Sequence, residues 1–249
     1  MVRVDGKLII LSGPSCVGKS PLFKALAKFY PDLSASLQPL VLYNSREPRP
    51  GETDDVDYHF RDRSMIESLR ERSDHVVLEV RGDLQALDIG ELRGQLAGGP
   101  VLFEGNPFVG RILIEHPQLC EVRKTSAFMA PVCRVEMEYV LRADVAVDAS
   151  EFVTEMMRRK LTRRMRRQKK SLGALEHDEI ERRARSAFGE LRLAGLFDVV
   201  IPNHDGEDSE NWLDLGMPIG DARRALDAFA ALLRGESSEL FESWAGLEF

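Results

Sequence analysis

Eight consecutive residues near the amino end have the strongest chemical signature: Gly13 to Ser20 spell Gly-Pro-Ser-Cys-Val-Gly-Lys-Ser. The segment matches the pattern G-x-x-x-x-G-K-[ST], whose glycines let backbone N–H groups curl around nucleotide phosphates. Lys19 would bridge the β- and γ-phosphates of ATP, and the Ser20 hydroxyl would ligate Mg²⁺. We interpret Cys16 as a small filler rather than a redox thiol. The predicted ATP-binding residues of this loop are Gly13, Pro14, Ser15, Cys16, Val17, Gly18, Lys19 and Ser20.

A second candidate phosphate site follows at residues 45–52, Ser-Arg-Glu-Pro-Arg-Pro-Gly-Glu, with Asp-Tyr-His-Phe at 57–60. Arg46 and Arg49 lie three residues apart in a segment that proline and glycine stiffen. Guanidinium groups bind a phosphate dianion in fork geometry, and a rigid loop loses little entropy on binding. The Tyr58 hydroxyl would add one hydrogen bond. Taken alone, the segment also fits a solvated polar turn.

Together the two motifs resemble guanylate kinase, a family that transfers the γ-phosphate of ATP to GMP. The resemblance covers most of residues 7–110 and about 180–205. It implies a P-loop core, a subdomain for the nucleoside monophosphate and a mobile lid. It also implies roles for further residues. The acceptor site would comprise Arg46, Arg49, Tyr58, Glu79 as the guanine reader and Glu104, which would serve either the acceptor or Mg²⁺. The lid arginine Arg183 would reach the transferring phosphate, and Asn203 would lie beside the donor adenine.

Several positions depart from the pattern of the family. Leu42 replaces a serine or threonine, and Asp88 and Gly90 replace a tyrosine and a serine in an ungapped comparison. Asn106 replaces an aspartate. These changes do not affect the expected phosphate-binding residues, but they alter the expected base-binding site. A kinase for another phosphorylated acceptor, a modified nucleotide or a sugar phosphate, therefore remains an alternative. A non-catalytic binding module is a further alternative, although Lys19 and Ser20 are present.

A basic run lies between Arg158 and Lys170, with nine Lys or Arg in thirteen positions. Transfer chemistry needs positive charge on a segment that closes over both substrates. We expect Arg164 and Arg167, from a pool that includes Arg163, to join Lys19, Arg46 and Arg183 as catalytic residues. Most of the run would be a solvated helix face. A nucleic-acid strip is disfavoured because no aromatic residues interleave with the charges.

Short apolar runs alternate with helical patterns, which predicts an α/β fold with a parallel sheet flanked by helices. Expected strands lie at 7–11, 76–78, 100–103, 125–129 and 199–201. Expected helices follow residue 20, begin with a capping box at Ser64 and Glu67, cover most of 151–194 and span 221–233. The single domain would consist of a core (1–40, 96–131, 195–235), an acceptor-binding subdomain (41–95), an insertion and helical lid (132–194) and a tail (236–249).

Composition sets the remaining limits. The chain has 249 residues, 43% hydrophobic and 30% charged, with a formal charge of −7, which excludes collagen-like and wholly disordered classes. The apolar run at 8–11 is too short for a membrane span. Three unclustered cysteines favour a reducing cytoplasm. The expected partners are small-molecule nucleotides, without a membrane or nucleic acid. Residues 204–208, His-Asp-Gly-Glu-Asp, would be an acidic loop rather than a metal cluster.

Overall fold

A five-stranded parallel sheet forms the centre of the protein, whose computed structural model describes residues 6–49, 51–142, 144, 146–169 and 171–249. Most of its strands are runs of buried apolar residues, as expected for parallel strands covered on both faces. This confirms the predicted α/β class. In spatial order the strands are β2 (Gln38–Pro39), β7 (Val101–Gly105), β1 (Lys7–Ser12), β8 (Arg123–Ala130) and β9 (Val199–Pro202).

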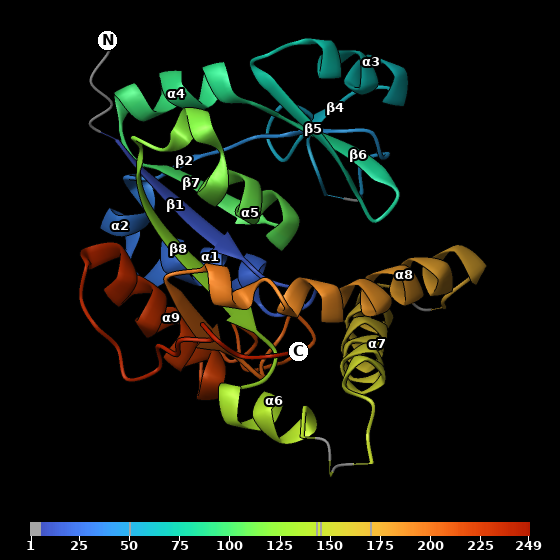
Figure 1. Cartoon of the computed structure of the whole chain (residues 1–249). Coiled ribbons are helices and arrows are strands. Elements are labelled where there is room, and N and C mark those ends of the chain that lie inside the picture. Colours follow the sequence, from blue (N-terminus) through green and yellow to red (C-terminus); the bar gives the residue numbers. More distant parts are fainter. Residues whose placement is uncertain (1–5, 50, 143, 145, 170) are drawn as a thin grey trace.

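Helices flank this sheet (Figure 1). α5 packs against β1, β7 and β8, whereas α9 packs against α1 and β9. Asn106 begins α5 by accepting a hydrogen bond from the Phe108 N–H, and Pro107 occupies the first turn, where its missing N–H costs nothing. The flanking helices are α1 (Lys19–Phe29), α2 (Pro31–Ala35), α4 (Ile89–Gly98), α5 (Pro107–Glu115), α6 (Arg134–Val140) and α9 (Gly220–Arg234).

A second, four-stranded sheet lies beside the first, in the upper right of Figure 1. Its spatial order is β4 (His59–Phe60), β3 (Tyr43–Asn44), β6 (Asp83–Asp88) and β5 (His75–Val80). Helix α3 (Arg63–Ser68) covers one face around Ile66, Leu84 and Ala86. The predicted capping box is wrong: Asp62 is at the cap position of α3, and its side chain makes no capping hydrogen bond.

Two long helices project on the right of Figure 1, α7 (Ala149–Gln168) and α8 (Ala174–Leu191). They pack against each other extensively. The expected helical segment is therefore broken near its middle, at Gly173, whose N–H donates to Glu176 at the start of α8. The predicted insertion, 132–155, contains α6 and the first turns of α7. Lys170, at the end of the basic run, lies outside the described residues.

The tail after α9 runs along the outer edge of the central sheet. Glu242 forms an isolated antiparallel bridge with Val200 of β9, with N···O distances of 2.8 and 2.9 Å. Trp244 is buried and donates to the Glu242 carboxylate at 2.9 Å. Phe249 packs on Phe188 of α8, with ring centroids 5.8 Å apart. The tail thus covers one sheet edge and connects it to α8.

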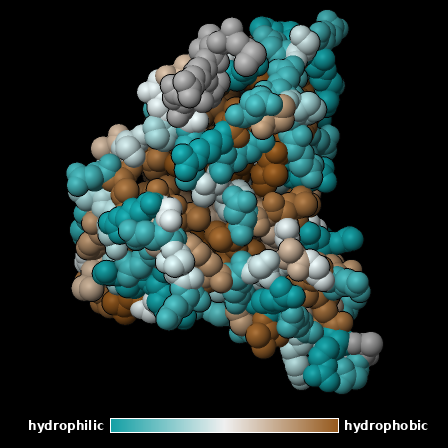
Figure 2. Space-filling model, turned by 60° about the vertical axis from the view of Figure 1, so that its left-hand side comes forward, coloured by the Kyte–Doolittle hydropathy of each residue, from teal (hydrophilic) through white to brown (hydrophobic). Residues whose placement is uncertain are grey.

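The outer surface carries both hydrophobic and hydrophilic residues. Figure 2 shows hydrophobic patches between larger hydrophilic areas on one face. Among the described residues, no helix combines the length and the apolar character that crossing a membrane requires.

Candidate active site

The loop between β1 and α1 has a backbone conformation that requires glycine at two positions. Gly13 and Gly18 have positive φ angles of 152° and 100°. A Cβ on Gly13 would lie 2.4 Å from the Met129 carbonyl oxygen, and one on Gly18 would lie 2.6 Å from Asn203 Nδ2. Both contacts are too close to exist. The glycines therefore give a tight loop whose backbone donors open toward a bound anion.

Cys16 is the one residue other than glycine in this loop with a positive φ, 69°. Its side chain is buried, and burial raises the pKa of the thiol well above its ordinary value. A thiol in this state is a poor nucleophile. The structure thus favours the interpretation of Cys16 as a filler.

Lys19 lies at the first position of α1 and folds back over the loop. Its Nζ donates to the carbonyl oxygens of Gly13 and Pro14, each at 2.8 Å. Burial lowers the pKa of Lys19. Next to it, the Ser20 hydroxyl donates to Glu104 Oε1 at 3.1 Å. A hydroxyl and a carboxylate side by side are the hard oxygen ligands that Mg²⁺ prefers.

The candidate acceptor site lies across from the loop. Arg46 makes two hydrogen bonds to the Glu52 carboxylate, at 2.6 and 2.7 Å, and its guanidinium lies 5.1 Å from the Tyr58 ring centre. Arg49 donates to Glu179 Oε1 of α8 at 2.9 Å. Both guanidinium forks therefore already bind carboxylates, which carry the charge and planar oxygen pair that Arg also recognises in phosphate. Pro50 of this motif lies outside the described residues.

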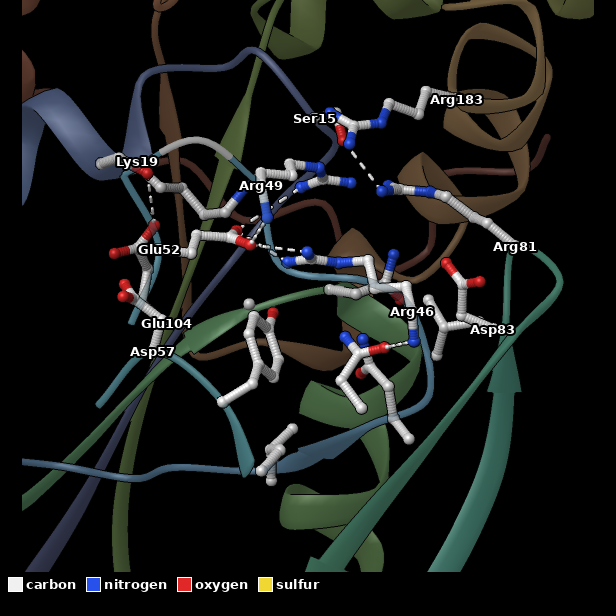
Figure 3. Close-up of a pocket in the computed structure, with 18 of the residues that line it drawn as sticks. Ser15, Lys19, Arg46, Arg49, Glu52, Asp57, Arg81, Asp83, Glu104 and Arg183 are labelled. Carbon is white, nitrogen blue, oxygen red and sulfur yellow. Dashed lines mark hydrogen bonds and ion pairs between the residues drawn. The ribbon is translucent and has the colours of Figure 1, made fainter. Parts of the chain in front are cut away.

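Both sites open into one cavity of about 300 Å³. Figure 3 shows Lys19 and Glu104 on one side of it and the guanidinium groups of Arg46, Arg49 and Arg183 converging on the other. A glycine-lined cradle that faces a pair of arginine forks across one cavity defines a kinase that transfers phosphate to a phosphorylated acceptor. The wall includes the predicted residues Gly13, Ser15, Cys16, Lys19, Ser20, Arg46, Arg49, Tyr58, Glu104, Arg164 and Arg183.

The two helices α7 and α8 contribute unequally to the cavity wall. Arg164 of α7 and Arg183 of α8 line the cavity, and Arg183 pairs with Glu179 on its own helix. Arg167 lies outside it and pairs with Glu210 at 3.0 Å. Arg163 likewise pairs with Asp208, with N···O of 2.6 Å. α7 turns Arg167 toward the acidic loop after β9, and the contact of Arg167 with the reacting phosphate stays a prediction.

Glu79 also lies outside the cavity, against the expectation that it reads the base. Cross-strand partners share a face of a sheet, and Glu79 pairs with Leu84, which packs under α3. Its side chain is 60% exposed and lies 3.5 Å from Arg63 of α3. Glu79 therefore lies in β5 on the face of the hairpin that α3 covers.

Other polar side chains occupy the position expected of Glu79. Asn44 and Gln85 are direct cross-strand partners, both are buried, and both line the cavity together with Asp83 and Leu42. Asp88 and Gly90 do not line it. Asp88 instead caps α4 by accepting from the Glu91 N–H at 2.9 Å.

Because Glu79 lies on the α3 face, we expect Glu79→Gln to change the acceptor KM and kcat by less than about twofold, within the range typical of surface substitutions. Gln85→Leu is the matched comparison, since Gln85 is on the cavity wall and its loss should raise the acceptor KM. Steady-state kinetics with varied acceptor measures both. A tenfold rise in KM for Glu79→Gln would contradict this assignment.

Asn203 lies behind the loop rather than in the cavity. It is fully buried, and its Nδ2 donates to Val17 O at 2.7 Å and Asp205 O at 2.6 Å. The amide therefore fixes the glycine loop to the end of β9. The expected contact with a donor adenine is not part of this arrangement.

The side chains of the acidic segment after β9, residues 204–208, have separate partners. Asp205 accepts from Ser209 and Asn211, whereas Glu207 lines the cavity, with an Oε2 that is buried and has no partner among the described residues. His204 lies between Glu136 of α6, at 2.8 Å, and Asp221 of α9, at 2.7 Å. These residues do not converge on one point, as a metal cluster would require.

His204 makes stability depend on pH. Burial alone would lower the pKa of His204, but hydrogen bonds to Glu136 and Asp221 outweigh it and raise the pKa. A raised folded-state pKa stabilises the fold fully below about pH 6.5, and this contribution disappears as pH rises through the raised value. We therefore expect the free energy of unfolding of wild type to exceed that of His204→Gln most at about pH 6. Urea unfolding at several pH values tests this, and a difference that grows toward pH 9 would contradict it.

No sequence motif pointed to Arg81, which lines the cavity from the turn between β5 and β6. Arg81 Nη1 donates to Ser15 Oγ at 2.8 Å, and its Nε donates to Glu190 Oε1 at 2.9 Å. Arg81-Gly82 between two strand-like runs is a signal for a hairpin turn. Nothing local indicates where the side chain points.

Comparisons with known proteins agree with this geometry. A family model described as guanylate kinase matches residues 5–85. A guanylate kinase from Aromatoleum aromaticum is 32% identical over 209 residues, covering 81% of this chain and 82% of that protein. One from Rhodococcus jostii is 32% identical over 202 residues, covering 80% and 81%.

A solved structure shows the same fold. The crystal structure of guanylate kinase from Anaplasma phagocytophilum matches with a TM-score of 0.55 at 18% identity, covering 96% of this chain and 89% of that one. The chain belongs to the guanylate kinase family, and is thus a nucleoside monophosphate kinase.

Proposed function

We propose that this enzyme transfers the γ-phosphate of ATP to a nucleoside monophosphate, with GMP as the principal acceptor and GDP as the product. The observation that carries the proposal is the shared cavity, in which the glycine loop and the forks of Arg46 and Arg49 face each other. Phosphoryl transfer asks the protein mainly for positioning and charge. The cavity walls carry groups for positioning the substrates and groups with positive charge.

Each group has a role in this proposal. The loop and Lys19 bind the phosphates of ATP, and displacement of Glu52 and Glu179 frees the two forks for the acceptor phosphate. Arg164 and Arg183 add positive charge from the lid. Ser20 and Glu104 would bind Mg²⁺, which when bound neutralises charge on the β- and γ-phosphates. Glu207 is also on the cavity wall, and its buried Oε2 has no partner in the described part of the chain, which fits a nearby cation.

The base end of the cavity supports guanine through different residues from those expected. The Asp83 carboxylate suits the adjacent N1–H and N2 donors of guanine, and the amides of Asn44 and Gln85 can donate to its O6. Amides also accept hydrogen bonds, however, and they replace the carboxylate expected at Glu79. This observation favours, as a second candidate, a kinase of the same architecture for a modified nucleotide or a sugar phosphate.

A coupled assay of ADP release with GMP, dGMP, AMP, UMP and ribose phosphates tests the proposal. We expect GMP to accelerate ADP release most strongly when ATP and Mg²⁺ are present. Acceleration by another acceptor but not by GMP would establish the second candidate. No acceleration by any acceptor, with ATP still bound, would indicate a non-catalytic binding module.

A further inference from the structure

We propose that Arg81 is a catalytic arginine, which the acceptor-side hairpin supplies and which contacts the phosphoryl group during transfer. This inference rests on the proposed function, and it adds a residue that none of the sequence motifs contains. Three observations carry it: the backbone conformation of the turn, the direction of the side chain, and its position between donor and acceptor groups.

The turn has a conformation that an arginine rarely adopts. Arg81 and Gly82 have φ angles of 56° and 92°, the positive pair of a type I′ hairpin turn. Asn-Gly is the favoured pair for such a turn, so an arginine there is strained. Backbone strain of this kind persists where the surroundings determine it, and it clusters at active sites. From this turn the side chain leaves its own sheet and reaches Ser15 of the glycine loop.

The two edges of the Arg81 guanidinium have different partners. Nε and Nη2 both donate to Glu190 Oε1, which also accepts from Asn106 Nδ2 at 3.0 Å. Glu190 is fully buried, so Arg81 supplies the opposite charge that this carboxylate requires. Nη1 points the other way, to Ser15 in the loop. Glu190 therefore fixes one side of the guanidinium and leaves the other facing the phosphate cradle.

Arg81 lies between the groups proposed to bind the two substrates. Figure 3 shows Arg81 reaching toward Ser15, with Arg46, Arg49 and Arg183 around the same space. The charge of Arg81 also acts on Lys19, whose pKa burial chiefly lowers and Arg81 lowers further. An oxygen of a nucleotide phosphate bound in the loop would take the place of the Ser15 hydroxyl as the acceptor for Nη1.

The chemical step defines what Arg81 does. An oxygen of the acceptor phosphate forms a bond to the γ-phosphorus, while the bond from that phosphorus to the β,γ-bridging oxygen breaks and ADP leaves with the electron pair. Arg81 exchanges no proton. It stabilises negative charge on the oxygens of the group in transfer, where one well-placed donor contributes roughly 10²–10³ in kcat. Because the hairpin carries it, this charge reaches the cradle only when the acceptor subdomain lies against the core.

The test uses Arg81→Asn, which keeps a residue favoured at this turn and removes the guanidinium. Arg81→Lys keeps a charge without the fork, and Arg70→Met removes an exposed arginine of the same subdomain that lies outside the cavity. We expect kcat to fall by about 10²-fold in Arg81→Asn. Arg81→Lys should recover only part of this, and Arg70→Met should retain wild-type kcat.

A binding measurement separates catalysis from structural support. Calorimetry would give the affinities for ADP alone, for GMP alone, and for GMP with ADP and aluminium fluoride, which mimics the group in transfer. Arg81→Asn should bind ADP and GMP within about threefold of wild type and lose the tighter binding of the mimic. Equal losses for all three ligands, or an unchanged kcat, would overturn the inference while wild-type activity leaves the proposed function intact. Absence of transfer by wild type would overturn both.

Discussion

Replacing Lys19 with methionine should lower kcat by about 10³-fold or more while the fold persists. The Lys19 ammonium lies 2.8 Å from two carbonyl oxygens of the glycine loop, and removing a preorganised charge from a phosphoryl-transfer site costs at least as much as one hydrogen-bond donor. Methionine has a similar length and suits the buried environment of this side chain. The substitution also removes a buried charge, so we expect the melting temperature to remain within a few degrees.

Steady-state kinetics with ATP and acceptor measures the effect, and circular dichroism checks the fold. Lys24→Met is the matched control, because Lys24 lies on the same helix α1 and is exposed. It should retain wild-type kcat. If Lys19→Met transferred phosphate within tenfold of the wild-type rate, the glycine loop would not be the donor site.

Replacing Arg46 with methionine should raise the acceptor KM and lower kcat/KM for the acceptor by about 10²-fold, because a bidentate, charge-assisted contact to a phosphate disappears. The KM for ATP should change little, since Arg46 lies across the cavity from the loop. Arg46→Lys should recover only part of the loss, because an ammonium lacks the planar fork.

The Arg46 variants need a control for general effects on the subdomain. Arg61→Met serves, because Arg61 pairs with Asp54 and Asp55 on the same subdomain and does not line the cavity. Its kinetic constants should match those of wild type. An Arg46→Met enzyme with an unchanged acceptor KM and a raised ATP KM would assign the fork to the donor instead.

The glycine loop and the parallel strands could be predicted because their signals are local. Eight contiguous residues define the loop, and four of the five core strands contain apolar runs bounded by glycine, proline or charge, whereas β2 (Gln38–Pro39) contains none. β6 (83–88) was missed because Asp83, Gln85 and Asp88 interrupt its apolar pattern. Asp83 and Gln85 lie on the face of this sheet that lines the cavity, and Asp88 caps α4.

The site residues that sequence reasoning misplaced depend on register and on distant contacts. A shift of one residue along a hairpin moves a side chain to the other face, and this separates Glu79 from Gln85 and Asp83. Arg81 and Glu190 are 109 positions apart in the chain, so no local pattern can indicate their contact. The position of Arg167 could not be predicted for a similar reason, because the face of α7 that meets the cavity depends on how α7 packs against α8.

The bridge between Glu242 and Val200 has a consequence for self-association. β9 is the last strand of the central sheet, and an open edge strand offers N–H and C=O groups that can template pairing with another molecule. The bridge occupies these groups at Val200, and the buried Trp244 anchors the segment beside them. Residues 236–249 thereby cover part of this edge and leave fewer free backbone groups there for pairing with another molecule, and none of them lines the cavity.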